Sequence, residues 1–409
     1  MRGENSPFVP AGTPTSSQHG FPSVKTLGYY QGRDALPRVR GHGALLRLEK
    51  SKRVTTPKAF ASGSFREHGS QSSLRDALRF VIGSGAANPK TSAMAQTVAI
   101  VGAGVSGLTC AVVFAEHGHR TAIFAEQIGP GTTSAAAAAI WYPYDAGPSE
   151  QTIAWALETY HTLLDLARAA RSGVSILELR TFSRTGEIEI PKWALPLGAR
   201  RLRSEIPPAF VSGFALTVPL MDTTIYLDYL ARRFRDAGGE IHPNRRLAKL
   251  EEVDPGFDLV INCTGIGART LVQDSDLEPH RGQVAIMPKI DLPHAVVCDD
   301  SPLMYAIPRT NDCVFGGTNQ LTDNCHADPA ATANIVAECS RVLEIKKPDV
   351  LGERVGLRPF RRSGIRVERA QLCDGRVLIH DYGHGGSGFT FSWGCAGAVA
   401  AIATAESGK

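Results

Sequence analysis

VAIVGAGVSGLTCAVVFAEHGHRTAIFAE, residues 98–126, contains a short apolar strand, a glycine-rich turn and a helix in direct succession. Gly102, Gly104 and Gly107 have the spacing G-x-G-x-x-G, and residues 108–117 are predicted to be helical. Such glycines allow a tight turn, a close approach of backbone to a pyrophosphate, and close packing of the helix on the strand. The stretch therefore predicts a dinucleotide-binding βαβ unit.

Phosphate and ribose contacts are expected around this turn. The helix begins near Val105 and Ser106, where unpaired N–H groups would hold the pyrophosphate. A second strand, residues 121–125, ends before Glu126, which lies 19 residues past Gly107 and can accept from both ribose hydroxyls. Three hydroxyl residues follow, namely Thr132, Thr133 and Ser134. They can contact the cofactor or merely cap a helix, and the unit alone does not separate FAD from NAD.

Composition limits the class of protein. The 409 residues allow two domains, and 43% hydrophobic with 21% charged residues is typical of a water-soluble globular protein. No apolar run is as long as a membrane span. The net charge of +4 is uneven, because residues 1–93 hold 14 Lys and Arg against 5 Asp and Glu. The remainder is mildly acidic, which argues against a nucleic-acid-binding surface.

The first 93 residues are rich in Ser, Gly, Pro and Arg and have no sustained periodicity. This composition predicts disorder. The segment resembles a transit peptide, or else it lies upstream of a natural start at Met94. We favour the second interpretation, and neither adds chemistry.

The cysteines are scattered, without a C-x-x-C pair. This pattern argues against zinc and against a disulfide framework, and it fits reduced thiols in a cytoplasmic protein. We expect no metal site, and we expect most of the cysteines to be buried. The eight positions are 110, 263, 298, 313, 325, 339, 373 and 395.

Two later segments also have the features of a nucleotide site. The strand 258–263 ends in Thr264 and Gly265, which would face the cofactor at the carboxyl edge of a parallel sheet. Glycines at 383, 385, 386 and 388 separate another strand from a small-residue helix predicted at 396–405. Nucleotide elements at both ends imply an α/β fold with a discontinuous Rossmann-type domain, residues 94–145, 240–280 and 355–409. A mixed β-sheet substrate domain would comprise residues 146–239 and 281–354.

The segments between these motifs also show strand and helix patterns. Helices are predicted at 150–170 and 222–238, and strands at 214–219, 241–250, 281–287, 304–308 and 313–318.

Arg358 stands in a G-x-R-P sequence and offers a planar fork that can bind a carboxylate in a bidentate manner. With this residue in place, the chain resembles the D-amino-acid oxidase family of FAD enzymes from about Val98 to Ala403. The motifs that carry the resemblance are LIHDYGHGGSGFTFSWGCA (378–396), VGLRPFRRSGIRVE (355–368), RGQVAIM (281–287), INCTG (261–265), and MYAIPRT with FGGTNQ (304–320).

The resemblance implies roles for individual residues. Arg358 and Tyr305 would bind the substrate α-carboxylate, and the Gly386 carbonyl would accept from its amine. The FAD-binding residues would be Gly102, Gly104, Val105, Ser106, Gly107, Glu126, Thr132, Thr133, Ser134, Leu247, Thr264, Gly265, Gly385, Gly386, Ser387, Gly388, Phe389 and Thr390. Within this set, Thr390 would contact the pyrimidine edge of the isoalloxazine.

The implied reaction is oxidative deamination of a D-amino acid by hydride transfer from Cα to flavin N5. O₂ would reoxidise the flavin to give hydrogen peroxide, and the imine would hydrolyse to a 2-oxo acid and ammonia. The expected partners are a small-molecule substrate and O₂, with no nucleic acid and no membrane, and a homodimer is allowed. Alternatives are a D-aspartate oxidase, a glycine- or sarcosine-type amine oxidase, and a D-amino-acid dehydrogenase.

Some positions depart from the family pattern. The segment 298–305 is shorter than the active-site lid of vertebrate members and lacks its second tyrosine, and Ser387 replaces a common tyrosine. Asn319 and Met304 offer no second cation for an acidic side chain, so neutral or apolar D-amino acids are expected. The carboxyl-terminal Glu-Ser-Gly-Lys409 is not a peroxisomal address, which favours a cytoplasmic location.

Overall fold

The computed structural model describes residues 95–144 and 149–405. One of its two sheets has six strands in the order β14-β15-β7-β1-β2-β6. All neighbouring pairs are parallel except β14 with β15. The bounds are β1 Thr97–Val101, β2 Arg120–Phe124, β6 Glu240–His242, β7 Leu259–Asn262, β14 Arg366–Gln371 and β15 Val377–Tyr382.

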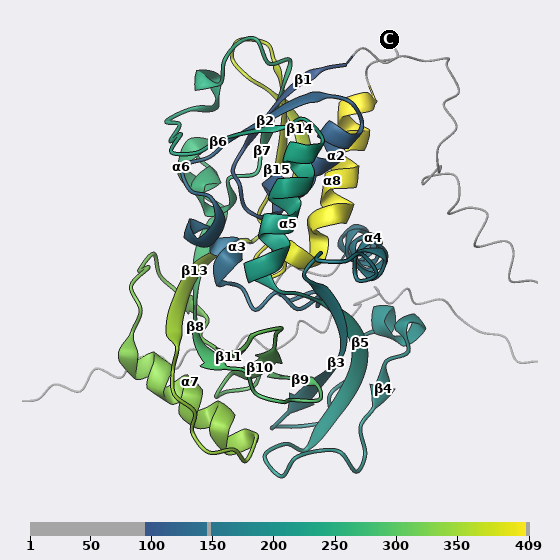
Figure 1. Cartoon of the computed structure of the whole chain (residues 1–409), viewed down its shortest axis with the longest axis vertical. Helices are drawn as coiled ribbons and strands as arrows, with labels where there is room; N and C mark the ends of the chain where they lie inside the picture. The colour runs from purple at the N-terminus through teal and green to yellow at the C-terminus, as the bar shows by residue number, and fades with distance from the viewer. Residues whose placement is uncertain (1–94, 145–148, 406–409) are drawn as a thin grey trace, which may run out of the picture. The chain divides into compact units, whose positions relative to one another are not determined.

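Alternating side chains of β1 place a core on each face of this sheet. Val98 and Ile100 pack toward the helices, while Ala99 and Val101 pack into a smaller cluster on the other face. Figure 1 shows α2, α5 and α8 together beside the sheet, and α4 contacts α8. Their bounds are α2 Val105–Glu116, α4 Glu150–Leu166, α5 Thr223–Asp236 and α8 Gly388–Thr404.

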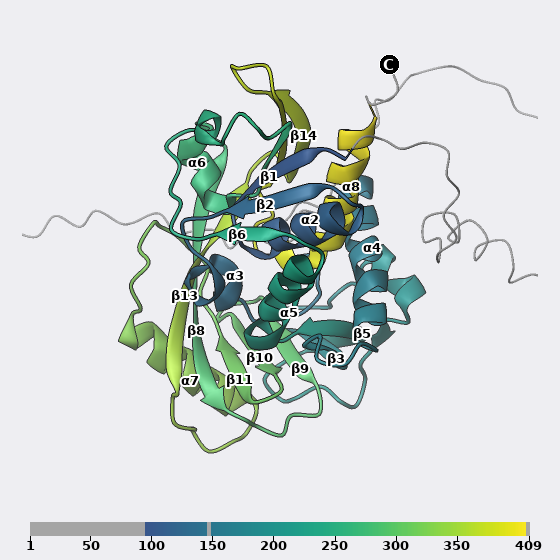
Figure 2. The same cartoon turned by 45° about the horizontal axis from the view of Figure 1, so that its top comes forward.

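A second sheet of nine strands has the order β12-β8-β11-β10-β9-β3-β5-β4, and β13 pairs with β8. It lies beyond the carboxyl ends of β1 and β7, as Figures 1 and 2 show from two sides. The bounds are β3 Val174–Ser183, β4 Arg200–Arg201, β5 Ser212–Met221, β8 Leu277–Pro288, β9 Ala295–Cys298, β10 Met304–Pro308, β11 Asp312–Gly316, β12 Gln320–Leu321 and β13 Gly352–Arg361.

The two faces of the nine-stranded sheet have different surroundings. On β10, Met304 and Ala306 pack into a core with helix α7, Pro329–Val342. Tyr305 and Ile307 point to the opposite face, where they line a cavity between the two sheets. One face therefore stabilises the sheet, and the other is available to a ligand.

Most of the strands and helices predicted from the sequence are present, including the complete βαβ unit. The strand predicted at 241–250 is wrong beyond His242, because Pro243 has no N–H group and Asn244 has a φ of +58°. The last helix begins at Gly388, eight residues before its predicted start. That helix requires glycine at position 394, because a Cβ there would collide with the backbone of Trp155 in α4.

Strand β13 was not predicted, and it belongs to the nine-stranded sheet although the domain boundary was placed at residue 355. The division into domains stays a prediction. The predicted disorder of residues 1–93 and the start at Met94 lie outside the described residues. Within residues 95–144 and 149–405, no helix has the length and apolar character needed to cross a bilayer.

Candidate cofactor and substrate site

A cavity of about 750 Å³ lies between the two sheets and brings most of the predicted site residues together. The predicted residues on its wall are Gly102, Gly104, Val105, Ser106, Glu126, Thr132, Thr133, Ser134, Leu247, Thr264, Gly265, Tyr305, Arg358, Gly385, Gly386, Gly388, Phe389 and Thr390. Gly107 and Ser387 are not on the wall. The cavity extends from the carboxylate of Glu126 at the six-stranded sheet to Arg358 on the nine-stranded sheet.

The glycine turn after β1 is closely packed. Gly102 has a φ of +111°, and a Cβ there would lie 2.9 Å from the carbonyl carbon of Cys263. A Cβ on Gly107 would collide with the carbonyl of Gly102, which explains why Gly107 packs the helix on the turn and does not face the cavity. Both glycines are required by close backbone approaches.

The first turn of α2 is suited to an anion. Its N-cap, Gly104, has no side chain to satisfy the helix N–H groups, and the first turn contains no acidic residue. The Val105 N–H donates to Oγ of Ser134 (2.9 Å), and a Cβ on Gly104 would lie 3.1 Å from the same Oγ. The positive end of this 12-residue helix therefore opens onto the cavity beside a hydroxyl group, as a pyrophosphate would require.

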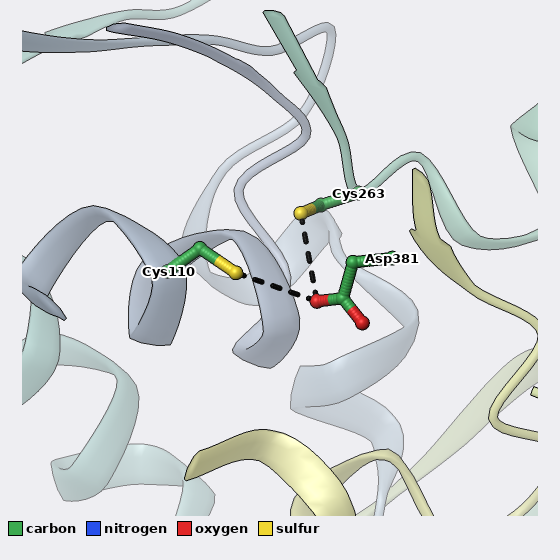
Figure 3. Close-up of side chains that lie close together, drawn as sticks. All are labelled: Cys110, Cys263 and Asp381. Carbon is green, nitrogen blue, oxygen red and sulfur yellow. Dashed lines mark hydrogen bonds between the residues drawn. The ribbon is translucent and has the colours of Figure 1, made fainter. Parts of the chain in front are cut away.

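A buried polar cluster of Cys110, Cys263 and Asp381 lies beside the glycine turn (Figure 3), and Cys263 and Asp381 also line the cavity. The thiols of Cys110 and Cys263 donate to Oδ2 of Asp381, at 3.4 and 3.8 Å. Oδ1 of Asp381 lies 3.2 Å from Nε2 of His384. The hydrogen bond with Cys263, together with burial, raises the pKa of Cys110 well above its usual value, and burial raises the pKa of Cys263.

These residues, with Cys395, are of types that can bind a metal. Protonated thiols are poor ligands, however, and the expectation of no metal site stays a prediction. All eight cysteines are free, and six are buried.

The ribose end of the cavity includes two arginines that the sequence did not indicate, Arg245 and Arg246. Nη1 of Arg246 lies 3.5 Å from Oε1 of Glu126, and both side chains are largely exposed. Leu247 lines the cavity directly after them. The end of the cavity where Glu126 was predicted to bind the ribose thus carries charges of both signs.

At the other end, Arg358 lies flat over the backbone of β8. A Cβ on Gly282 would lie 2.5 Å from Nη1 of Arg358, so this arrangement requires glycine. The same nitrogen donates to the Thr318 carbonyl (3.0 Å). The ring of Tyr305 covers Gly316 and Gly317 on the neighbouring strand in the same way.

The Tyr305 phenol lies beside this guanidinium. Burial raises the pKa of Tyr305, and the charge and hydrogen bond of Arg358 oppose that rise. Because both side chains line the same cavity, a fork of two N–H donors and one O–H donor is available at one place. This donor set suits a carboxylate.

The glycine loop is held against β13. The Gly385 N–H donates to the Pro359 carbonyl (2.9 Å), and Phe360 forms an isolated bridge with His384. Arg358 on β13 and Gly386 in the loop after β15 are therefore adjacent, and a Cβ on Gly386 would lie 3.5 Å from Cδ of Arg358.

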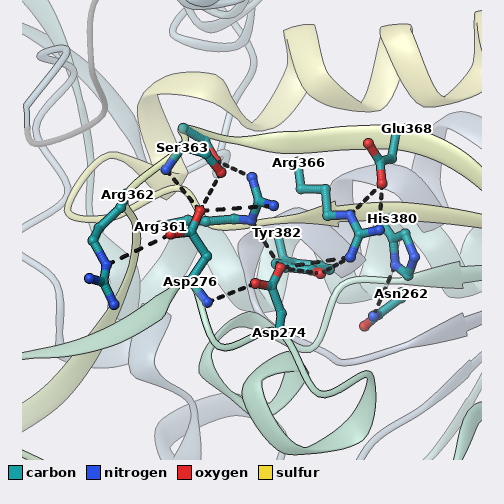
Figure 4. Close-up of polar contacts among 11 residues, drawn as sticks. Asn262, Asp274, Asp276, Arg361, Arg362, Ser363, Arg366, Glu368, His380 and Tyr382 are labelled. Carbon is teal, nitrogen blue, oxygen red and sulfur yellow. Dashed lines mark hydrogen bonds and ion pairs between the residues drawn. The ribbon is translucent and has the colours of Figure 1, made fainter.

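A polar network fixes the ends of the strands on both sides of this loop (Figure 4). Asp274 accepts from Nε of Arg361 (2.9 Å) and from the Tyr382 hydroxyl (2.8 Å). Arg366 donates to the same hydroxyl (2.6 Å), and Asp276 accepts from the Ser363 N–H (3.0 Å). The network ties the ends of β13 and β15 to one short segment, which maintains the position of the loop.

Two predicted cofactor residues hold protein backbone in this structure. Ser387 Oγ accepts from the Tyr144 N–H (2.6 Å), and Thr390 Oγ1 accepts from the Tyr142 N–H (3.1 Å) and donates to its carbonyl (3.0 Å). The predicted FAD contacts of these residues stay predictions. Ser387 is buried, and its visible role is to place Tyr144.

Tyr144 is a site residue that the sequence analysis missed. It lines the cavity, and its ring lies 2.6 Å from where a Cβ on Gly386 would be. In the sequence, only the aromatic cluster Trp141-Tyr-Pro-Tyr144 could have indicated that Tyr144 belongs to the site. The other residues missed on the nine-stranded sheet are mainly apolar, namely Leu179, Val284, Val297, Leu303 and Ile307, with Asp299 at the edge.

Comparison with known proteins gives a consistent result. A family model described as FAD dependent oxidoreductase matches residues 97–402. A D-amino-acid oxidase of Rubrobacter xylanophilus is 39% identical over 315 residues, which cover 75% of this chain and 95% of that protein. A D-amino-acid oxidase of Streptomyces coelicolor is 37% identical, over 75% and 96% of the two chains. The human D-aspartate oxidase is 35% identical, over 73% and 92%.

Solved structures show the same fold at lower identity. Glycine oxidase from Geobacillus kaustophilus matches with a TM-score of 0.64 and 18% identity, covering 76% of this chain and 94% of that one. This agrees with the predicted α/β architecture of a parallel and a mixed sheet.

Proposed function

This chain belongs to the FAD-dependent oxidoreductase family, and from that membership we propose that it oxidatively deaminates neutral or apolar D-amino acids to 2-oxo acids. The chain covers nearly the whole length of relatives that are named D-amino-acid oxidases. The observation that carries the proposal is that Arg358 and Tyr305 lie side by side in the cavity that the glycine turn opens into.

The residues present fit FAD. The N-terminus of α2, the tight contacts of Gly102 and the hydroxyl of Ser134 suit a pyrophosphate, and Glu126 suits a ribose. When bound, FAD supplies the hydride acceptor and the two-electron redox chemistry.

The remaining work of the protein is to orient the substrate. Arg358 and Tyr305 hold the α-carboxylate, and the Gly386 carbonyl accepts from the amine, which must be neutral to release electrons from Cα. Two fixed points on one substrate leave the α-hydrogen and the side chain in defined directions. Only one enantiomer can then turn its hydrogen toward the cofactor while its side chain enters the protein pocket.

The preference for a neutral side chain is supported by the wall of the cavity on the nine-stranded sheet. In the cross-strand register, Tyr305 has Val297 on one side and Gly316 followed by Val284 on the other. Leu303 and Ile307 extend this surface along β10. An apolar side chain gains free energy on burial here, whereas a carboxylate would lose its hydration. Of the described arginines on the cavity wall, Arg245 and Arg246 follow the strand end near Glu126, which leaves Arg358 for the α-carboxylate.

D-Aspartate oxidation is the second candidate, because the human D-aspartate oxidase is 35% identical. Anaerobic titration of the holoenzyme separates the candidates. D-Alanine and D-valine should bleach the flavin absorbance, and L-alanine should not. Preferential bleaching by D-aspartate would favour the second candidate, and bleaching by sarcosine alone would overturn the proposal. Peroxide yield under air tests O₂ as the acceptor, and sedimentation tests the allowed homodimer.

A further inference from the structure

The wall of the cavity contains two adjacent polar side chains that the proposed reaction does not use, Asp381 and His384. Both residues are buried, with exposed fractions of 1% and 3%. Oδ1 of Asp381 lies 3.2 Å from Nε2 of His384, but the two atoms are not aligned for a hydrogen bond. Within residues 95–144 and 149–405, neither atom has another hydrogen-bond partner. Buried polar atoms are normally hydrogen-bonded, so this pair is suited to a group that enters the cavity.

The lack of a partner coincides with the cavity. Three other buried side-chain atoms among the described residues also lack a hydrogen bond, and they belong to Thr181, Arg184 and Ser340. None of these three residues lines the cavity. In the part of the chain that the structure describes, Asp381 and His384 alone combine such an atom with a place on the cavity wall.

The Asp381 carboxylate is oriented from behind. Its Oδ2 accepts from the thiols of Cys110 (3.4 Å) and Cys263 (3.8 Å), as Figure 3 shows. The pKa of both thiols is raised, so they remain protonated donors. One carboxylate oxygen is therefore occupied, and Oδ1 is left for a ligand. The carboxylate also favours a proton on the facing Nε2 of His384, which makes this nitrogen a donor.

The pair lies between the two ends of the cavity. Asp381 contacts Cys263, whose carbonyl packs against Gly102 in the turn suited to a pyrophosphate. His384 directly precedes the glycine loop, which is adjacent to Arg358 at the substrate end. A cofactor that reaches from the pyrophosphate site to the substrate must therefore pass these two side chains. In FAD, the group that connects the pyrophosphate with the flavin ring is the ribityl chain, a row of hydroxyl groups.

The chemistry of the pair suits a hydroxyl group. A phosphate placed against Asp381 would be repelled by the carboxylate. A hydroxyl group is neutral, and it both donates and accepts, so it can donate to Oδ1 of Asp381 and accept from the Nε2–H of His384.

We propose that Asp381 and His384 bind the ribityl hydroxyl groups of FAD, with Cys110 and Cys263 holding the carboxylate in position. This inference rests on FAD as the cofactor and does not depend on which amino acid is oxidised. Its test measures cofactor affinity without an amino acid, so failure of the proposed substrate class would leave it intact.

The test compares FAD with ADP, which has the adenosine and the pyrophosphate but no ribityl chain. Dissociation constants are measured by titration calorimetry on the full-length apoprotein. Asp381→Asn should lower the ratio of FAD affinity to ADP affinity by about tenfold, because a charge-assisted hydrogen bond to the ribityl chain is replaced by a neutral one. His384→Leu should lower the same ratio, and His384→Gln, which keeps an N–H donor, should restore part of it.

The matched control is Asp222→Asn. Asp222 is also buried, with 3% of its surface exposed, and lies outside the cavity wall. Asparagine can still accept from the Thr224 N–H at the start of α5, and the change in net charge is the same as in Asp381→Asn. The control should leave the ratio of the two affinities unchanged.

An unchanged ratio in folded Asp381→Asn would overturn this inference. Equal weakening of FAD and ADP would also overturn it, because the effect would then arise at the glycine turn. If Asp381→Asn does not fold, the native protein and His384→Leu decide, by titration with FAD and with an analogue that has an alkyl chain in place of the ribityl chain. A native preference for FAD that His384→Leu reduces supports the inference. Equal native affinities, or a preference that His384→Leu leaves intact, refute it.

Discussion

Replacing Gly282 by alanine tests whether the arrangement of Arg358 is what binds the substrate. An added Cβ would lie 2.5 Å from Nη1 of Arg358, whereas ordinary contacts begin near 3.4 Å. The guanidinium must therefore move by about 1 Å. Because the obstacle is the end of a flexible side chain and not backbone, folding should be little affected.

The cost falls on substrate binding. Displacing the guanidinium breaks its hydrogen bond to the Thr318 carbonyl and moves its two donors out of register with a carboxylate. A charge-assisted hydrogen bond contributes about 1.5–3 kcal/mol, and a displacement of about 1 Å can lower a rate about 100-fold. We expect kcat/KM for D-alanine to fall by about 100-fold, mainly through KM, with FAD still bound.

The assay is steady-state peroxide production together with flavin content and thermal unfolding. The matched control is Gly352→Ala on β13, where an added Cβ has no atom within 4 Å, and it should retain native kinetics. Native KM values in Gly282→Ala, in a folded protein with full flavin content, would refute the assignment of Arg358 to the substrate carboxylate.

Three further predictions concern other parts of the molecule. Ser387→Ala removes the acceptor of the Tyr144 N–H and should lower stability by about 1–3 kcal/mol, by urea unfolding, with FAD affinity reduced. Burial lowers the pKa of His380 to about 4. The neutral side chain therefore contributes fully to stability above about pH 6.5, and this contribution, at most about 3 kcal/mol, is lost as the pH falls toward 4. His380→Asn should make the free energy of unfolding less dependent on pH in this range. Deletion of residues 1–93 should leave flavin content and activity unchanged, and loss of FAD on deletion would contradict the interpretation of that segment.

Local sequence was sufficient to predict the βαβ unit. The glycines at 102, 104 and 107 act within a few residues of one another, and alternation in β1 reports burial on both faces of the sheet. Arg358 and Tyr305, which belong to long and specific motifs, lie on the wall of one cavity, and their roles in substrate binding stay predictions.

The contacts between distant segments could not be predicted in the same way. Tyr144 meets Gly386 only because Ser387 binds the backbone at 144. The hydrogen bond from the Gly385 N–H to the Pro359 carbonyl connects the glycine loop with β13. Neither residue belongs to a periodic sequence pattern from which this contact could be predicted.

The cysteines illustrate a limit of spacing arguments. Cys110 and Cys263 are far apart in the sequence and belong to different elements, so no linear motif connects them. The fold nevertheless brings both to one carboxylate, Asp381. Clusters of this kind arise from topology and have no signature in a single sequence.

The pairing of β7 with both β1 and β15 has a consequence for biosynthesis. Strands β1 and β2 of the six-stranded sheet can form early, but β15 and the loop 383–388 leave the ribosome only after more than 270 further residues have followed β1. Nascent chains should therefore wait in a partly open form, with apolar strand edges exposed to chaperones and to one another. Supply of flavin during expression should then govern the yield of intact protein, because the ligand can trap only a finished chain.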